Sequence, residues 1–302
     1  MELTFHFSKH TIHRFQQVQS LLDQLDPEEQ PEALIVPESP VPRGEIIVFP
    51  GSFNPPTTAH LALMKQARQS ALHRREQSHK SNQTVQLFAA MSKLTVDKEH
   101  VERPLMLDRV ILLDDLLKRR LPHTGVMLFN RGLYVEQAEA VHRCFSKVKK
   151  LYFLIGYDKI VQILDPHYYA DRDVALRDLF ALAELLVAPR ADFGPQALAE
   201  LLQKPENQPF AQYIHPLPFN NAYRNVSSTH IRQHSGAYKH DIPHEVQPFM
   251  RNTRAYAPPL RLADGTEVDY YAERVKVLQA LLRNAAGEKS ACSSQSVSHH
   301  LR

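Results

Sequence analysis

From Glu45 onward, short apolar runs alternate with segments whose apolar residues recur every three or four positions. The short runs are rich in β-branched and aromatic residues, which predicts strands over 46–49, 85–91, 125–129, 151–155 and 184–188, with a short sixth strand starting at 213. The intervening pattern predicts helices after residue 60 and over 103–120, 134–145, 159–183 (broken at 165–166) and 194–203. This alternation predicts an α/β fold, a Rossmann-like parallel sheet with helices on both faces.

The two ends of the chain depart from this alternation. Residues 13–25 have helical spacing and predict an N-terminal helix that packs on the main domain, followed by a proline-dense, extended connector up to Gly44. Near the other end, residues 269–284 predict an amphipathic helix, and the Ser- and His-rich stretch after it has little to bury. We therefore divide the chain into an N-terminal helix and connector (1–44), a main domain (45–250), a helical C-terminal extension (251–286) and a disordered tail (287–302).

The first predicted strand ends in a small polar loop that leads into a helix. Gly51 lets a ligand approach the backbone closely, and Ser52, Asn54, Thr57 and Thr58 supply neutral hydrogen-bonding groups. His60 falls in the first turn of the helix. A strand, a tight turn and a helix N-terminus in this order predict a site for a phosphate group.

Other unusual residues also follow predicted strands. Gly156-Tyr157-Asp158 follows the fourth strand, and Pro189-Arg190 follows the fifth. In parallel sheets such positions meet at one edge, where ligands bind. A second helix start, residues 225–232, combines Ser227, Ser228 and Thr229 with Arg232, so that hydroxyls and a guanidinium can face one anion.

Composition narrows the class of protein. The 302 residues are 43% hydrophobic and 23% charged, with a net charge of +3, which predicts a globular protein without the strong field expected for nucleic-acid or membrane binding. The 17 histidines show no metal-ligand spacing, and two distant cysteines favour a reducing compartment. Because we find neither a signal-peptide pattern nor a long apolar run, we expect a cytoplasmic location. The sequence leaves open whether the chain forms a homo-oligomer.

Two motifs together resemble a known superfamily. GSFNPPTTAH (51–60) and SSTHIR (227–232) resemble the first-loop and ISSTxIR elements of the nucleotidyltransferases, which include mononucleotide adenylyltransferases and cytidylyltransferases. The GSFNPxT form is most similar to nicotinamide and nicotinate mononucleotide adenylyltransferases. The residues after the fourth and fifth strands resemble the GxD and xR elements of the same family. Each motif alone is weak, whereas both in this order, separated by the β–α pattern, are specific. The resemblance covers roughly residues 45 to 250.

The resemblance implies a reaction and a set of site residues. It implies transfer of AMP from ATP to a phosphorylated acceptor, nicotinamide or nicotinate mononucleotide, with release of pyrophosphate, as in NAD biosynthesis. His60 and Arg232 are the implied catalytic residues. The implied nucleotide contacts are Gly51, Ser52, Phe53, Asn54, Thr57, Gly156, Asp158, Ser228 and Thr229. As acceptor contacts we predict Lys98, Arg109 and Arg190, although the segment around Lys98 matches no motif of the family. Mg²⁺ would bridge the phosphates mainly through water and substrate oxygens.

Each role has a structural alternative. His60 could only hydrogen-bond to its own turn, Ser228 and Thr229 could be helix caps, and Arg232 could be a solvated arginine. Asp158 before a helix is an ordinary N-cap. For the protein as a whole, the alternatives are a cytidylyltransferase, an adenylyltransferase with another acceptor, or a nucleotide-binding protein without turnover. The aromatic residues that would stack on a nicotinamide ring are not evident in the sequence.

Overall fold

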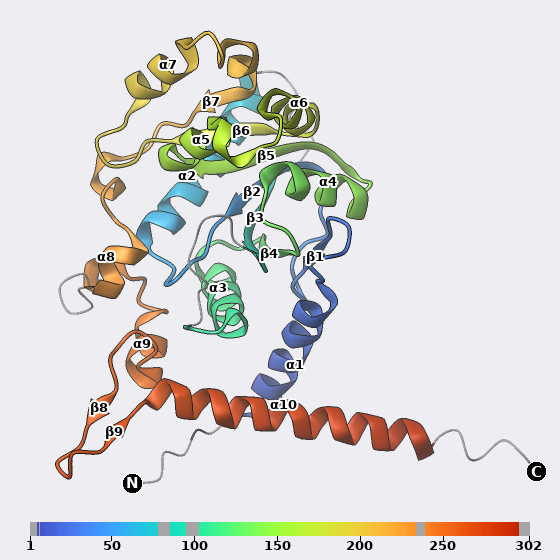
Figure 1. The fold of residues 1–302 in the computed structure, drawn as a ribbon, viewed down its shortest axis with the longest axis vertical. Helices are drawn as coiled ribbons and strands as arrows, with labels where there is room; N and C mark the ends of the chain where they lie inside the picture. Colours follow the sequence, from blue (N-terminus) through green and yellow to red (C-terminus); the bar gives the residue numbers. More distant parts are fainter. Residues whose placement is uncertain (1–4, 6, 78–84, 95–102, 234–238, 296–302) are drawn as a thin grey trace, which may run out of the picture.

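The computed structural model describes residues 5, 7–77, 85–94, 103–233 and 239–295 and has one large sheet at its centre (Figure 1). The seven strands lie in the order β1-β4-β3-β2-β5-β6-β7. All are parallel except β1, which is antiparallel to β4. Their bounds are β1 Ala33–Ile35, β2 Gly44–Pro50, β3 Val85–Ser92, β4 Thr124–Phe129, β5 Val148–Gly156, β6 Glu184–Ala188 and β7 Ile214–Pro216.

The predicted Rossmann-like α/β fold is confirmed, with one strand added. The connector predicted as extended chain contains β1, whose three residues pair with Phe129, Leu128 and Met127 of β4. Prolines on both sides of this segment suppress any strand pattern in the sequence. Its place at the sheet edge is compatible with them, because an edge strand pairs on one side only.

Helices cover both faces of the sheet, because the central strand β2 is apolar on both sides. Ile47 and Phe49 pack on one side with helices α1 (Lys9–Gln24), α2 (Thr58–Gln77), α3 (Met106–Arg120) and α10 (Tyr270–Gln295). Ile46 and Val48 pack on the other side with α4 (Tyr134–Cys144), α5 (Tyr157–Leu164), α6 (Arg172–Leu182) and α7 (Pro195–Gln203). The predicted break at 165–166 is confirmed, because a 3₁₀ turn, Pro166–Tyr168, separates α5 from α6.

The strand order has a switch point at β2. From β2 the chain passes through α2 to β3 on one side, and β5 pairs with β2 on the other. At such a point the connections leave in opposite directions, which opens a crevice at the carboxyl ends of the strands. The fold therefore places the ends of β2, β5 and β6 around one crevice.

The C-terminal part forms a second layer against α1 and α3. It contains α8 (Ser228–Gln233), α9 (Gln247–Thr253), the hairpin β8 (Leu260–Arg261) and β9 (Glu267–Val268), and α10. Helix α10 crosses the base of the molecule and meets α1 (Figure 1). The N-terminal helix α1 also packs against α3 of the main domain, as predicted. Among the described residues, no helix has the length and apolarity that crossing a membrane requires.

One boundary differs from the prediction. The tail was predicted to be disordered from residue 287, but α10 continues as a helix to Gln295. The stretch AAGEK at 285–289 contains strong helix formers, so the preceding helix can propagate through it. Residues 296–302 lie outside the described part of the chain.

Candidate active site

Two neighbouring cavities open at the carboxyl edge of the sheet. The larger has a volume of about 580 Å³ and lies among the ends of β2, β5 and β6 and the start of α8. The smaller has about 120 Å³ and lies toward the ends of β3 and β4. Pro50, Gly51, Ser52 and Lys159 line both cavities and so form their shared wall.

Most of the predicted site residues line the larger cavity. Ten of them come together there from four separate segments, and Arg109 lines the smaller cavity instead. Lys98 lies outside the described residues. The ten are Gly51, Ser52, Asn54, His60, Gly156, Asp158, Arg190, Ser228, Thr229 and Arg232.

Two of the predicted nucleotide contacts, Phe53 and Thr57, are placed differently. Both are 1% exposed and neither lines the cavity. Phe53 has a left-handed backbone (φ 43°), which costs about 1–2 kcal/mol for a residue with a side chain. Burial of its ring against Phe49 and His60 offsets this cost. Phe53 and Thr57 therefore support the loop from beneath.

Thr57 fixes the orientation of His60. The backbone N–H of Thr57 donates to Nδ1 of His60 at 2.9 Å, and the Thr57 hydroxyl lies 2.9 Å from the same atom. In return, the backbone N–H of His60 donates to the hydroxyl oxygen at 3.3 Å. A backbone N–H can only donate, so Nδ1 is the acceptor and the neutral imidazole carries its hydrogen on Nε2. The loop thus prepares His60 as a hydrogen-bond donor.

Helix α8 is tied to the first loop through Asn54 and Pro55. Nη1 of Arg232 donates to the carbonyl of Asn54 at 2.6 Å, and Nη2 donates to the Thr229 hydroxyl at 3.3 Å. The Ser228 hydroxyl donates to the carbonyl of Pro55 at 2.8 Å. The one hydrogen of that hydroxyl is engaged by Pro55 in this arrangement, and the contact of Ser228 with a phosphate stays a prediction. The two motifs are about 170 residues apart in the chain, and these hydrogen bonds hold them together in the fold.

The opposite wall of the larger cavity carries Asp158 and Arg190. Nε of Arg190 lies 3.6 Å from Oδ1 of Asp158, and both side chains are about half exposed. A Cβ atom on Gly156 would lie 2.6 Å from the same carboxylate oxygen. A side chain at position 156 would therefore displace the Asp158 carboxylate from this position on the cavity wall.

Sequence reasoning missed three cationic residues of this cavity. Arg103, Lys159 and Arg224 line it together with Arg190 and Arg232, and Asp158 is the one carboxylate among its described lining residues. Nε of Arg224 is buried without a hydrogen-bond partner among the described atoms. Lys159 directly follows Asp158 and could have been proposed from that adjacency, whereas Arg103 and Arg224 carry no signal in the sequence. The excess of cations suits a polyanionic ligand.

The smaller cavity combines one buried cation with aromatic walls. Arg109 is 8% exposed, and its guanidinium donates to the carbonyls of Pro104 at 3.2 Å and Ser52 at 3.0 Å. Within the described part of the chain it has no carboxylate partner, and burial lowers its pKa below the ordinary arginine value. The other walls include the aromatic rings that the sequence did not reveal, from Tyr134, Tyr168 and Tyr169.

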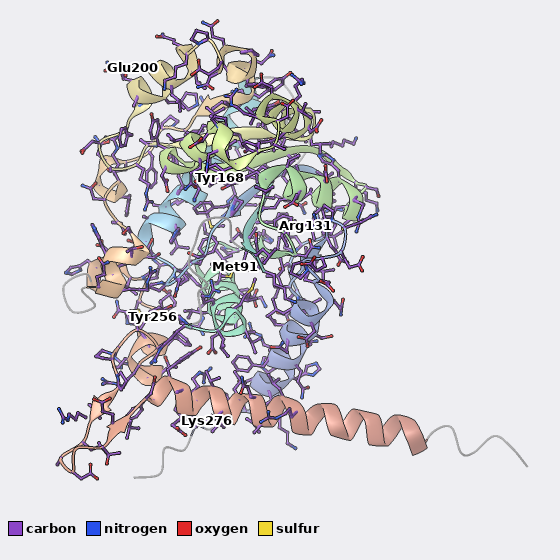
Figure 2. All side chains as sticks on the ribbon, in the orientation of Figure 1. Met91, Arg131, Tyr168, Glu200, Tyr256 and Lys276 are labelled. Atoms are coloured by element: carbon purple, nitrogen blue, oxygen red, sulfur yellow. The ribbon has the colours of Figure 1, made fainter. Side chains whose placement is uncertain are left out.

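Tyr134 and Tyr169 of the smaller cavity stay protonated at neutral pH. Burial raises the pKa of Tyr169 to about 12 and that of Tyr134 above its usual range. Met91 and Tyr168, labelled in Figure 2, come to this cavity from β3 and from the turn after α5. The cavity is thus an aromatic slot with a positive charge near Ser52.

The donor set suits a metal that is held by substrate oxygens. No cluster of three or more His, Cys, Asp or Glu side chains that could hold a metal ion occurs among the described residues. Asp158 at the larger cavity is engaged by Arg190. Mg²⁺ keeps several waters and binds through few carboxylates when phosphates supply the remaining ligands. Binding of Mg²⁺ together with a nucleotide therefore stays a prediction.

Comparisons with known proteins identify the family of the chain. A solved structure of a candidate nicotinate-nucleotide adenylyltransferase from Vibrio parahaemolyticus is similar to the chain, at 13% identity, with a TM-score of 0.39 and coverage of 71% of this chain and 96% of that one. No curated protein matches the chain significantly. The family model for cytidylyltransferase-like proteins matches residues 48–234, a span that contains both loop motifs and most residues lining the larger cavity. The chain therefore belongs to the cytidylyltransferase-like family of the nucleotidyltransferase superfamily.

Proposed function

We propose that this protein transfers AMP from ATP to a mononucleotide acceptor, nicotinamide or nicotinate mononucleotide, and releases pyrophosphate. The observation that supports this most is the pair of cavities that meet at Gly51 and Ser52. One is large and cationic, as a triphosphate requires, and the other is an aromatic slot with a buried arginine. Two substrates seated in them would bring their phosphates together at the shared wall.

The reaction forms one phosphorus–oxygen bond and breaks another. A phosphate oxygen of the acceptor attacks the α-phosphorus of ATP, and the bond from that phosphorus to the β-bridging oxygen breaks, so pyrophosphate leaves with the electron pair. Little covalent work falls to the protein, and positioning with charge stabilisation dominates. Mg²⁺ bound with the nucleotide would neutralise part of the phosphate charge.

The residues that line the two cavities suit specific roles in this step. His60, with its hydrogen on Nε2, donates to an oxygen of the α-phosphate as charge shifts. Arg232 and Arg224 stabilise the leaving pyrophosphate, and Arg190 and Lys159 add positive charge from the opposite wall. Arg109 neutralises the acceptor phosphate from behind Ser52. Asp158 accepts from a ribose hydroxyl of the nucleotide.

A test of this function is the release of pyrophosphate from ATP, Mg²⁺ and each mononucleotide, with CTP as the alternative nucleotide. We expect turnover with ATP and at least one of the two acceptors. Turnover with CTP alone would replace the proposal by cytidylyl transfer, which the family also contains. Failure of both nucleotides with these and other phosphorylated acceptors would refute the transferase function.

Replacement of His60 tests the mechanism. We expect His60→Ala to lower kcat by about 10²–10³-fold, the effect of removing one donor from a developing oxyanion. The matched control is His13→Ala, because His13 is exposed on α1 and distant from the site. An unchanged kcat in His60→Ala would leave the fold assignment intact and remove the proposed role of this histidine.

A further inference from the structure

Gln137 holds an unusual position in the smaller cavity. It lies on α4, is 3% exposed and contributes to the cavity wall. Its Nε2 donates to the hydroxyl of Ser92, the last residue of β3, at 2.9 Å and to the carbonyl of Gly132, after β4, at 3.1 Å. A carbonyl can only accept, so this contact fixes which end of the amide carries the nitrogen.

The oxygen at the other end of the amide receives no hydrogen bond from the described residues. Oε1 of Gln137 is buried and has no hydrogen-bond partner among the described residues. Both hydrogens of Nε2 are already engaged by Ser92 and Gly132. Rotation of the amide would break both bonds and set its oxygen against the carbonyl of Gly132. The side chain can therefore present an acceptor to a ligand but not a donor.

The sheet order separates Gln137 from the positive charges of the same cavity. Arg109 reaches the carbonyl of Ser52 after β2, and Lys159 stands after β5. The partners of Gln137 lie at the end of β3 and after β4, on the far side of β2 from β5. If the acceptor phosphate lies at the shared wall, its base extends toward Gln137, between the aromatic side chains of the slot.

We propose that Gln137 is a specificity-determining residue that selects an acceptor base with an uncharged carboxamide over one with a carboxylate. This inference rests on the proposed function. A carboxamide N–H donates to the waiting Oε1, whereas a carboxylate has only acceptor oxygens and would place its negative charge against that atom. A site that leaves a buried polar group unpaired with the wrong ligand discriminates strongly. Of the two mononucleotides, the protein therefore prefers the nicotinamide form.

Binding requires the slot to widen. Its volume of about 120 Å³ is below the ~300 Å³ of pockets that enclose a small molecule, so the walls must part to admit a ring. For a ligand to reach Oε1, which is buried, the same movement must also uncover this atom. The buried, unpaired acceptor then gains a partner only from a ligand that can donate.

The experiment compares kcat/KM for the two mononucleotides in the full-length protein and in Gln137→Leu. We expect the nicotinamide form to be preferred at least tenfold, and Gln137→Leu to lower its kcat/KM by tenfold or more while the nicotinate form changes less than twofold. The matched control is Gln162→Leu. Gln162 lines the same cavity, but its Oε1 accepts from Lys159, so the preference should persist. Gln137→Met serves if the leucine variant does not fold.

The outcomes separate this inference from the proposed function. Turnover without a preference for the amide, or a preference that survives Gln137→Leu and Gln137→Met, overturns the role of Gln137 and leaves the transferase function standing. If neither mononucleotide is turned over, the proposed function fails, and calorimetric titration with each mononucleotide decides the inference. Tighter binding of the amide form that is lost in Gln137→Leu supports it, and equal binding or none refutes it.

Discussion

At the scale of single residues, the site depends on side chains that hold others in place. Thr57 holds the imidazole of His60 in one tautomer, and Phe53 supports the same ring from the core. Arg109 donates a hydrogen bond to the carbonyl of Ser52, and Arg232 donates one to the carbonyl of Asn54. The loop between the cavities is therefore held from both sides. Residues without a direct contact to substrate therefore affect the rate through positioning.

The first prediction concerns Thr57. Thr57→Val keeps the shape and the backbone N–H but removes the hydroxyl beside Nδ1 of His60. Loss of one such hydrogen bond is worth about 1 kcal/mol, so we expect kcat to fall about fivefold with little change in the KM for ATP. Thr57→Ser retains the hydroxyl and should keep nearly the full rate. Equal rates in both variants would show that the backbone contact alone orients the ring.

Asp269 provides a prediction about pH. The hydrogen bond from Nη1 of Arg103, at 2.5 Å, holds the pKa of Asp269 below its usual value of 3.8. Because the folded-state pKa is depressed, the stabilisation is complete above about pH 4 and is lost as the pH falls through the folded-state pKa. Urea unfolding should therefore show Asp269→Asn to be less stable than the parent at pH 7, with a smaller difference at pH 3. Asp178→Asn, at an exposed position of α6, should show no such trend.

At the scale of elements, α10 is fastened to α3 by a buried polar cluster. Arg274 donates to one oxygen of Asp108 at 2.6 Å, and the Tyr271 hydroxyl donates to the other at 2.7 Å. The same hydroxyl accepts from the backbone N–H of Leu105 at the start of α3. The next residue, Arg109, reaches the loop between the cavities. The C-terminal extension thus holds α3 in place, and α3 in turn holds the loop at Ser52 through Arg109.

Removal of Asp108 tests this cluster. We expect Asp108→Ala to lower the free energy of unfolding by about 3–5 kcal/mol, because it leaves the Arg274 charge buried and unpaired. Tyr271→Phe should cost less, about 1–3 kcal/mol. Glu273→Ala on the same helix breaks only an exposed pair with Lys276 and should change stability by less than about 0.5 kcal/mol. Chemical denaturation measures all three, and similar values for Asp108→Ala and Glu273→Ala would contradict the cluster.

At the scale of the whole molecule, the larger cavity draws its charge from distant parts of the chain. Arg103 precedes α3, Lys159 and Arg190 follow strands of the sheet, and Arg224 and Arg232 belong to the segment around α8. Arg103 also donates to the carbonyls of Arg254 and Ala255, which ties the C-terminal extension to the cavity wall. Assembly of the cation-rich cavity therefore depends on the complete fold.

The prediction at this scale concerns Arg224. Its Nη2 packs against Gly194, where an added Cβ would lie only 2.8 Å from it. Its Nε is buried without a hydrogen-bond partner among the described atoms. We expect Arg224→Ala to weaken ATP binding about tenfold in calorimetric titrations, the loss of a charge-assisted contact of about 1.5 kcal/mol. Arg177→Ala, exposed on α6, is the matched control. Unchanged ATP affinity in Arg224→Ala would place this arginine outside the nucleotide site.

Local patterns in the sequence predicted the framework and much of the site. The period of apolar residues determined β2, β3 and β4 and the helices between them, because burial on one or both sides leaves a repeat that is visible within a few residues. The site residues in segments 51–60 and 225–232 were also predictable, because each segment is a short run of neighbouring residues that can be recognised in the sequence. The aromatic slot was not predictable, because Tyr134 and Tyr168 are distant in sequence and each is an ordinary residue in its own segment.

The sequence by itself determined the alternating α/β order and the two motifs, since both are recorded in neighbouring residues. Only the tertiary structure decided the pairing of β1 with β4, the joining of Arg232 to Asn54, the burial of Arg109 beside Ser52 and the unpaired oxygen of Gln137. These features depend on contacts between segments tens to hundreds of residues apart. Such contacts follow from how the whole chain packs, and no local period or propensity encodes them.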